Sequence, residues 1–324
     1  MVTVSIIVPH RVVLQSVADP KYCFETVNSF LASNGKPKQF EVILVGLSNE
    51  IKAGEGAFSI HPDKSIDEVS KTDLIIIPAI FGDFDLAIEE NREFIPWVVE
   101  QYENGAEIAT LCVGAFLLAS SGLLKGRKCS THWGFIDLFK DRFPEVIVQN
   151  GNIITEDSRL YSSGGANFYW NLLIYLVEKY VDREMAILIA KYFAIDISRH
   201  NQMLFSIFKG QKQHKDLEVK ETQQYIENNF GERFTVDDLA ENVALGRRSL
   251  ERRFKKCTNN TILEYIQRVK VEAAKRDFEN SEKNIAEVMY DVGYTDQKAF
   301  RSTFKRFTGL TPKEYKSRYR HSIN

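Results

Sequence analysis

The hydrophobic and polar positions follow one pattern over the first two hundred residues and a different pattern over the rest. Four early segments are short, rich in β-branched residues and almost wholly apolar, which is typical of parallel strands buried on both faces of a sheet. They are VTVSIIV (2–8), FEVILVG (40–46), DLIIIP (73–78) and EIATLC (107–112). The segments 20–33 and 84–104 between them are long enough for crossover helices. This alternation predicts an α/β domain with a doubly wound parallel sheet.

Ligands of such a sheet bind beyond the carboxyl ends of its strands. The segments that end at Pro78 and Cys112 are therefore expected to open onto a site. Farther along, EVIVQN and NIITED predict a hairpin that turns at Asn150–Gly151 and is appended to the sheet. The segment 167–180, NFYWNLLIYLVEKY, has the length and periodicity of a largely buried helix.

The pattern changes near residue 208. The segment 208–221, FKGQKQHKDLEVKE, is polar and charged without apolar periodicity, and it predicts a linker between domains 1–207 and 222–324. The second domain has no strand pattern and is expected to be all-α. Its clearest helix starts are Thr235, Asn284 and Thr311.

The second domain repeats itself at an offset of fifty residues, LERRFKKCTNNTILEY returning as FRSTFKRFTGLTPKEY. The first set of repeated positions is Leu250, Phe254, Lys255, Thr258, Thr261, Glu264 and Tyr265, and the second is Phe300, Phe304, Lys305, Thr308, Thr311, Glu314 and Tyr315. Each copy opens with two short helices, and the second helix has an apolar pair at i, i+4. This duplication predicts two helix-turn-helix motifs.

The outer faces of the two second helices are polar and basic. They carry Arg247, Arg248, Ser249, Arg252, Arg253, Lys255 and Lys256 in the first copy, and Gln297, Lys298, Arg301, Ser302, Lys305 and Arg306 in the second. Residues 211–324 hold 23 Lys and Arg against 18 Asp and Glu, whereas residues 1–210 hold 19 against 26. Any one of these side chains could be ordinary solvated surface. Two basic helices in two copies nevertheless favour double-stranded DNA as the partner, with bases read near the helix starts and phosphates held farther along.

The second domain strongly resembles the AraC/XylS family of transcription activators over about 100 residues. The resemblance is carried by the repeat and by IAEVxxxVGYxDQxxFxxxFKRxTGxTPxEYxxR. It implies two helix-turn-helix motifs joined by a long helix, here the segment 261–279. One departure is Gly246, at a turn position where Ser or Thr is usual, and it is expected to weaken the cap of the first recognition helix.

The first domain resembles the DJ-1/PfpI superfamily, which has a flavodoxin-like fold, over roughly residues 1–190. The resemblance rests on the segments LIIIP (74–78), ATLCVGAFLLASSGLLKGRKCSTHW and YSSGGANFYWNLLIYLVEKY. More narrowly, it is similar to the branch in which such a domain precedes an AraC-type unit. The resemblance implies that Cys112 lies at a nucleophile elbow, with His132 in the same pocket. The candidate pocket residues are Ser16, Ala79, Ile80, Cys112, Val113, His132 and Gly164.

Three hypotheses remain for this site. In an enzyme, the Cys112 thiolate would attack a carbonyl or amide carbon, His132 would be the base, and an oxyanion would be held by backbone N–H groups of Val113 and the 79–82 loop. In a sensor, the pocket would bind a small-molecule effector and pass its occupancy to the DNA-binding domain. In the third case Cys112 is a small buried hydrophobe and His132 a hydrogen-bonded core residue.

Two departures from the enzyme pattern count against catalysis. Members with activity resemble one another in an acidic residue on the loop after the first strand, where this chain has Gln15 and Ser16, with Asp19 three residues late. The glycine pair usual after IIP is replaced by Ala79–Ile80, and Gly82 is displaced. A regulatory pocket is therefore favoured over a catalytic one.

The remaining features fit a cytoplasmic transcription regulator. Four scattered cysteines without CxxC spacing give no sign of disulfides, a metal or a cofactor, and the uncharged run 108–124 is too short and too interrupted to span a membrane. We expect a homodimer, with RNA polymerase as a further candidate partner. The alternative function is a cysteine-dependent hydrolase, amidase or glyoxalase-like enzyme that uses Cys112 and His132.

Overall fold

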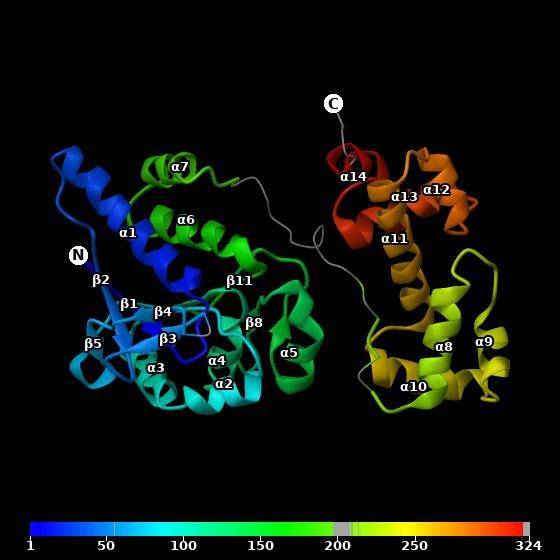
Figure 1. Ribbon diagram of the computed structural model, residues 1–324, viewed down its shortest axis with the longest axis horizontal. Helices are drawn as coiled ribbons and strands as arrows, with labels where there is room; N and C mark the ends of the chain where they lie inside the picture. The colour runs from blue at the N-terminus through cyan, green and yellow to red at the C-terminus, as the bar shows by residue number, and fades with distance from the viewer. Residues whose placement is uncertain (55, 197–207, 209, 213, 320–324) are drawn as a thin grey trace. The chain divides into compact units, whose positions relative to one another are not determined.

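The computed structural model describes residues 1–54, 56–196, 208, 210–212 and 214–319 (Figure 1). The chain divides into two compact units, Met1–Gln202 and Met203–Asn324. Each unit has its own hydrophobic core. The predicted end of the first domain, at residue 207, lies outside the described residues.

Seven of the described strands form the main sheet of the first unit, in the order β10-β11-β7-β6-β1-β2-β5. Their bounds are β1 Val2–Val8, β2 Phe40–Gly46, β5 Lys64–Ser65, β6 Leu74–Ile77, β7 Glu107–Thr110, β10 Ile154–Asp157 and β11 Leu160–Ser163. All neighbours pair in parallel except β10 with β11. The central order β2-β1-β6-β7-β11 is the 2-1-3-4-5 order of flavodoxin-like folds. The predicted fold class and its four strands are confirmed.

Helices cover both faces of this sheet, which explains the nearly continuous apolar runs. The helices are α1 Gln15–Ser33, α2 Phe84–Glu90, α3 Phe94–Glu103, α4 Ala115–Ser120, α5 Ile136–Arg142, α6 Tyr169–Tyr180 and α7 Arg183–Tyr192. Figure 1 shows α1, α6 and α7 on one side and α2, α3 and α4 on the other. Within β6, Leu74 and Ile76 join the core under α1 and α6, whereas Ile75 and Ile77 join the core under α3 and α4. Alternate side chains of one strand are thus buried on opposite faces.

The predicted hairpin at Asn150–Gly151 is wrong. The short strand β9, Ile147–Val148, pairs in parallel with β8, Lys128–Cys129. The antiparallel hairpin is formed one strand later by β10 and β11. Its turn residues Ser158 and Arg159 have φ values of 54° and 64°, a left-handed conformation in which glycine or asparagine is more usual, so the sequence carries no turn signal there. A further hairpin, β3 Ile51–Ala53 with β4 Phe58–Ile60, lies outside the main sheet.

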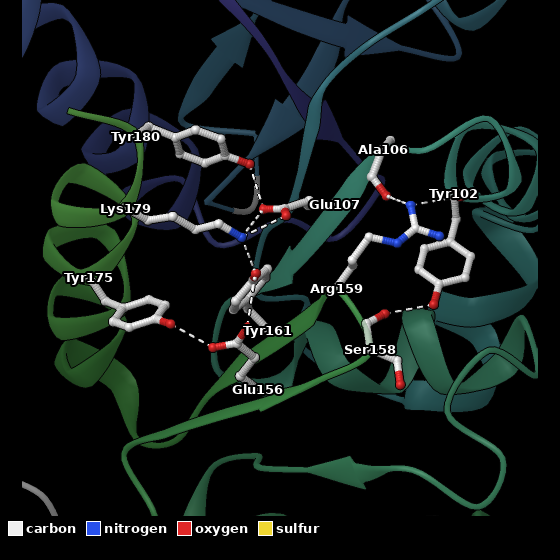
Figure 2. A network of polar contacts seen from close by, with 10 residues as sticks. All are labelled: Tyr102, Ala106, Glu107, Glu156, Ser158, Arg159, Tyr161, Tyr175, Lys179 and Tyr180. Carbon is white, nitrogen blue, oxygen red and sulfur yellow. Dashed lines mark hydrogen bonds and ion pairs between the residues drawn. The ribbon is translucent and has the colours of Figure 1, made fainter.

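A polar network fastens α6 and the β10–β11 hairpin to the start of β7 (Figure 2). Lys179 and Tyr180, at the end of α6, donate to the carboxylate of Glu107 over 2.5 to 2.7 Å. Lys179 also donates to the hydroxyl of Tyr161, a residue that is only 1% exposed. On the other side Arg159 donates to the carbonyl oxygen of Ala106 over 3.1 Å. The network therefore orients the strand whose other end carries Cys112.

The second unit consists of helices in the described residues. They are α8 Leu217–Asn228, α9 Val236–Asn242, α10 Arg247–Thr258, α11 Ile262–Asn280, α12 Ile285–Asp291, α13 Gln297–Thr308 and α14 Pro312–Tyr319. Thr235 and Asn284 cap α9 and α12 in reciprocal capping boxes, and Thr311 makes the same paired bonds with Glu314 before α14. The three predicted helix starts are confirmed. Helix α8 begins inside the segment 208–221 that the sequence predicts as a linker.

The repeat in the sequence is also a repeat in the structure. Helices α10 and α13 are twelve residues long and start fifty residues apart. Leu250 and Phe254 are buried in one small core, and Phe300 and Phe304 in another. Because each helix hides its apolar stripe, its opposite face is left in solvent.

Candidate functional site

Six of the thirteen predicted DNA-binding side chains are exposed, unengaged cations on the two second helices. Among the described residues, six cations on α10 and α13 make no side-chain hydrogen bond or ion pair. They are Arg248, Arg252, Lys256, Lys298, Arg301 and Lys305. The pKa of Glu314 is lowered mainly by hydrogen bonds from Thr311 and also by Lys305 and Arg301. These two cations form no ion pair with it, so all six charges are available to phosphates or base edges.

Other members of the predicted set have partners in the same unit. Arg247 pairs with Asp237 at 2.9 Å and with Glu251 at 3.2 Å. Lys255 donates to the carbonyl oxygen of Asn259 over 2.7 Å. Arg306 donates to Gln267, and Ser302 to a carbonyl oxygen of its own helix. Ser249 is half-buried, and Gln297 is exposed at the start of α13. These contacts are solvent-accessible, so they leave the side chains able to turn toward DNA.

Arg253 has a different position from its neighbours on α10. Its guanidinium donates two bonds of 2.7 Å to the carboxylate of Asp216 and one of 2.6 Å to Glu218. Its side chain is 28% exposed and lies against the start of α8. The bidentate pair lowers the pKa of Asp216. Arg253 therefore belongs to the packing of α10 on α8 and not to the outer face on which the sequence placed it.

The two recognition helices differ at their N-termini. Gly246 precedes α10 and offers no side-chain cap, as the sequence predicts. Asp296 precedes α13, and its carboxylate accepts the N–H of Lys298 over 2.8 Å. The first recognition helix therefore starts with one more unsatisfied N–H than the second.

Cys112 lies in a sharp elbow immediately after β7. Its φ of 55° is left-handed, which is unfavourable for a residue with a Cβ atom. The side chain of Ser163 accepts the N–H of Cys112 over 3.1 Å, and Thr131 donates to its carbonyl oxygen over 3.3 Å. A Cβ atom at Gly114 would lie 2.4 Å from the carbonyl oxygen of Pro78, so only glycine fits there. Ser163 and Thr131 are absent from the predicted site residues, although both lie in the segments that carry the DJ-1/PfpI resemblance.

The environment of the thiol is apolar. Cys112 is 7% exposed and belongs to the core cluster that contains Val113 and Phe116. Burial raises the pKa of Cys112 to about 12, and this outweighs the backbone N–H of Val113, which acts in the opposite direction. At neutral pH the side chain is therefore a neutral thiol, which is a poor nucleophile.

His132 is engaged away from Cys112. Its Nδ1 accepts the N–H of Gly134 over 3.0 Å, and its ring lies 5.0 Å from that of Trp133 and 5.6 Å from that of Phe135. Burial lowers its pKa, which keeps the imidazole neutral. In the part of the chain that the structure describes, no hydrogen bond joins His132 to Cys112. The arrangement lacks the thiol–base bond of an activated cysteine.

In the enzyme hypothesis a backbone N–H of the 79–82 loop stabilises the oxyanion. Here Ser16 already accepts a hydrogen bond from an N–H of this loop. Its hydroxyl accepts the N–H of Ala79 over 3.0 Å and donates to the carbonyl oxygen of Val13 over 2.6 Å. Asp19 does not replace the missing acid, because Oδ2 of its carboxylate accepts bonds from Tyr169 and Trp170 of α6. The loop is thus fastened to the start of α1 by a neutral side chain.

The other predicted pocket residues are buried around the elbow. Ile80 is 1% exposed and forms an isolated bridge with Val12. Gly164 is buried and donates its N–H to the carbonyl oxygen of Ile153 over 2.8 Å. The described residues contain no group of three or more His, Cys, Asp or Glu side chains able to hold a metal ion. Across the same residues every helix is too short or too polar to cross a bilayer.

Comparisons with known proteins agree with this architecture. The DJ-1/PfpI family matches residues 13–175, just over half of the chain, and a helix-turn-helix domain matches residues 239–318. The HTH-type transcriptional regulator GbdR of Pseudomonas aeruginosa is 24% identical over 269 residues, which are 82% of this chain and 71% of that protein. The HTH-type transcriptional regulator ArgR of the same species is 28% identical over 218 residues, 67% of this chain and 66% of that protein.

Two solved structures share the fold of the first unit. An AraC family transcriptional regulator from Pseudomonas putida has a TM-score of 0.51 at 17% identity and covers 60% of this chain and 100% of that one. A THiJ/PfpI family protein from Pseudomonas syringae has a TM-score of 0.51 at 16% identity and covers 60% of this chain and 75% of that one. The chain belongs to the DJ-1/PfpI family, and behind that domain it carries a helix-turn-helix domain of the AraC type.

Proposed function

We propose that this protein is a sequence-specific, DNA-binding transcription regulator. The observation that carries the proposal is the duplicated helix-turn-helix, in which α10 and α13 both bury an apolar stripe and leave exposed cations that form no ion pair on the opposite face. The relatives GbdR and ArgR are named as transcriptional regulators, which supports the same function.

The two recognition helices would enter successive segments of the major groove, about one helical turn apart. Arg248 and Lys298 lie in the first turns of α10 and α13, where side chains reach base edges. Lys256 and Lys305 lie farther along and would hold phosphates. If all six unengaged cations contact phosphate or displace counterions, the plot of log K against log salt has a slope of about −5.

The test is binding of the full chain to a genomic fragment library, followed by affinity measurements on a selected fragment from 50 to 200 mM salt. The pair Arg252→Ala and Arg301→Ala should weaken binding and make the slope shallower by about 2 if both contact phosphate. Arg92→Ala with Arg183→Ala removes the same charge from exposed positions of the first unit and should leave affinity unchanged. Wild-type selection of no common sequence would contradict the proposal.

The first domain is proposed to be a dimerisation and effector-binding domain, with Ser16, Ala79, Ile80 and Gly164 around the elbow as the effector pocket. Its net negative charge makes it the part that does not touch DNA. A cytoplasmic homodimer with RNA polymerase as a further partner fits this function. Sedimentation of the full chain should give twice the 37.2 kDa of one copy, and a single 37.2 kDa species at micromolar concentration would contradict the dimer.

Catalysis at Cys112 is not part of the proposed function. The neutral buried thiol, the engaged His132 and the Ser16–Ala79 bond argue against it. A screen of small aldehydes and amides should find no turnover by wild type that Cys112→Ala abolishes. Such turnover would establish the enzyme alternative.

A further inference from the structure

The chain immediately before α8 is docked on the first helix-turn-helix. We call its described residues the strap: Phe208, Gly210–Lys212 and His214–Asp216. The sequence predicts a free linker here, but the strap contacts α8, α10 and α11 by aromatic, backbone and ionic interactions. Three groups of contacts hold it along its length.

The first contacts lie at Phe208 and fasten the strap to α11. The Phe208 ring packs edge to face on the ring of Tyr265 at 5.0 Å, and its N–H donates to the carboxylate of Glu272 over 3.2 Å. Gly210 follows with a φ of 71°, and a Cβ atom there would lie 2.7 Å from the Tyr265 hydroxyl. A glycine is therefore required where the strap crosses this tyrosine.

The middle of the strap is tied to α8 and to the loop before α11. The backbone carbonyl of Gln211 accepts from Gln223 over 3.2 Å, and its side-chain oxygen accepts from Asn260 over 2.8 Å. Lys212 pairs with Glu227 at 2.6 Å. Gln223 is fully buried, so the strap satisfies a polar group of the unit that would otherwise face an apolar core.

The last contact is the one that reaches the recognition helix. Asp216 caps α8 by accepting the N–H of Val219 over 3.1 Å, and the same carboxylate holds Arg253 of α10 bidentately. Arg252 is the next residue on α10, about 100° away around the helix axis. With Arg253 held against α8, Arg252 is exposed.

The second copy lacks this connection. Fifty residues after Arg253 the chain has Thr303, which is 9% exposed and packs within its own unit. The other basic positions of α10 recur in α13 as polar or basic residues, including Lys255 as Lys305. Arg247, Arg252 and Arg253 all lose their charge in the second copy, but only Arg253 is replaced by a buried residue, at the position that meets the strap.

We propose that the strap positions the first recognition helix, with Asp216 and Arg253 as positioning residues that fix the rotation of α10. This inference rests on the proposed DNA-binding function. In this proposal the strap connects the first domain to the first recognition helix, α10. In the described residues the second recognition helix, α13, has no such connection. Coupling between domains requires an element with two alternative positions, and the proposal assigns this part to the strap.

In the proposed coupling the strap detaches while the unit stays folded. It is held mainly by polar contacts, and it borders a cavity of about 370 Å³. The lining residues are Phe208, Gly210, Glu227, Asn228, Val269, Glu272 and Arg276. Undocking would expose the Phe208 ring and leave Gln223 without the carbonyl of Gln211, a local cost that is smaller than global unfolding.

The test is a hydroxyl-radical footprint of the full chain on a selected fragment. Arg252→Ala and Arg301→Ala first assign which half of the site each recognition helix protects. Asp216→Asn then removes the charge that holds Arg253 but keeps an N-cap of equal quality. We expect affinity for the α10 half-site to fall by about fivefold while protection of the α13 half-site is retained. Arg253→Lys should restore part of the loss seen in Arg253→Ala, because one charged contact to Asp216 survives.

Asp291→Asn is the matched control, since it breaks an exposed pair with Lys283 in the second copy. It should leave both half-sites unchanged. Equal weakening of both half-sites by Asp216→Asn, or no weakening of either by Arg253→Ala, would overturn the proposal. Failure of wild type to protect any sequence would instead overturn the DNA-binding function, so the two failures are distinguishable.

Discussion

Cys112 is expected to be unreactive at neutral pH, although it lies in a nucleophile elbow. Alkylating agents react with the thiolate, whose population depends on the pKa. Burial raises the pKa of Cys112 to about 12, compared with about 8.5 for a free cysteine. A rise of at least about three pH units makes its thiolate at least about 1,000-fold less populated at pH 7.5.

Per-site alkylation by iodoacetamide in the native full chain measures this difference. Peptide mass spectrometry follows all four cysteines in one sample. Cys257 is half-buried on α10 and serves as the internal reference. We expect Cys257 to be modified long before Cys112, and both to be modified at similar rates in denaturant. The half-buried Cys257 thus controls for reagent quality and time in the same sample.

Ionisation of the buried Cys112 thiol should lower the free energy of unfolding as the pH rises. A thiol whose folded pKa is raised stabilises the fold fully below its unfolded pKa of about 8.5, and this stability is lost as pH rises toward 12. Above pH 8.5 wild type should lose about 1.4 kcal/mol per pH unit more than Cys112→Ala. Unfolding in urea followed by tryptophan fluorescence reports the first unit alone, because Trp97, Trp133 and Trp170 all lie in it.

Two results would refute this reasoning. One is alkylation of Cys112 faster than Cys257 at pH 7.5, which requires a depressed pKa and an open elbow. The other is a loss of stability above pH 8.5 that is identical in wild type and Cys112→Ala. Either result would revive the enzyme alternative, because the buried neutral thiol is its main physical objection.

Three further substitutions test the supports of the two sites. Ser16→Ala leaves the buried N–H of Ala79 unpaired, whereas the carbonyl oxygen of Val13 keeps the N–H of residue 16. It should cost the first unit about 1–3 kcal/mol in urea unfolding, whereas exposed Ser29→Ala should stay within about 0.5 kcal/mol. Gly114→Ala forces a Cβ atom onto two backbone oxygens and should cost about 3 kcal/mol or more in the same assay. Asp296→Ala should cost the second unit about 1 kcal/mol by circular dichroism, and Gly246→Ser should add a few tenths. Equal effects of Ser16→Ala and Ser29→Ala, or a neutral Gly114→Ala, would contradict the geometry.

The parts of the fold that the sequence predicts are those encoded by local patterns. The bounds of β1 and β2 agree residue for residue, because a strand buried on both faces is apolar along its whole length. The two helix-turn-helix motifs follow from apolar pairs and caps repeated at a fixed offset. The capping residues Thr235 and Asn284 are short-range signals of the same kind.

The errors lie where distant residues decide the structure. The Asn150–Gly151 pair is a good turn signal, but pairing of β9 with β8 depends on a segment nearly twenty residues away. Arg253 has the sequence environment of a surface cation, and only the distant Asp216 makes it a packing residue. His132 likewise lies at the sequence spacing from Cys112 that the family resemblance implies for a shared pocket. Its ring nitrogen instead accepts a hydrogen bond from the N–H of Gly134.

At Cys112 the backbone has the conformation of a nucleophile elbow, but the described residues around it do not supply the groups that would make the cysteine reactive. Its left-handed backbone is held by Ser163, Thr131 and the glycine at 114, which act on the main chain and are indifferent to the side chain at 112. Reactivity would need a charged or basic neighbour, and Ser16 stands where the resemblance implies an acid. A fold can therefore keep the turn of an enzyme after losing the groups that activate the nucleophile. What remains is a rigid buried turn at the carboxyl end of the sheet, where binding a small molecule would need no reaction at sulfur.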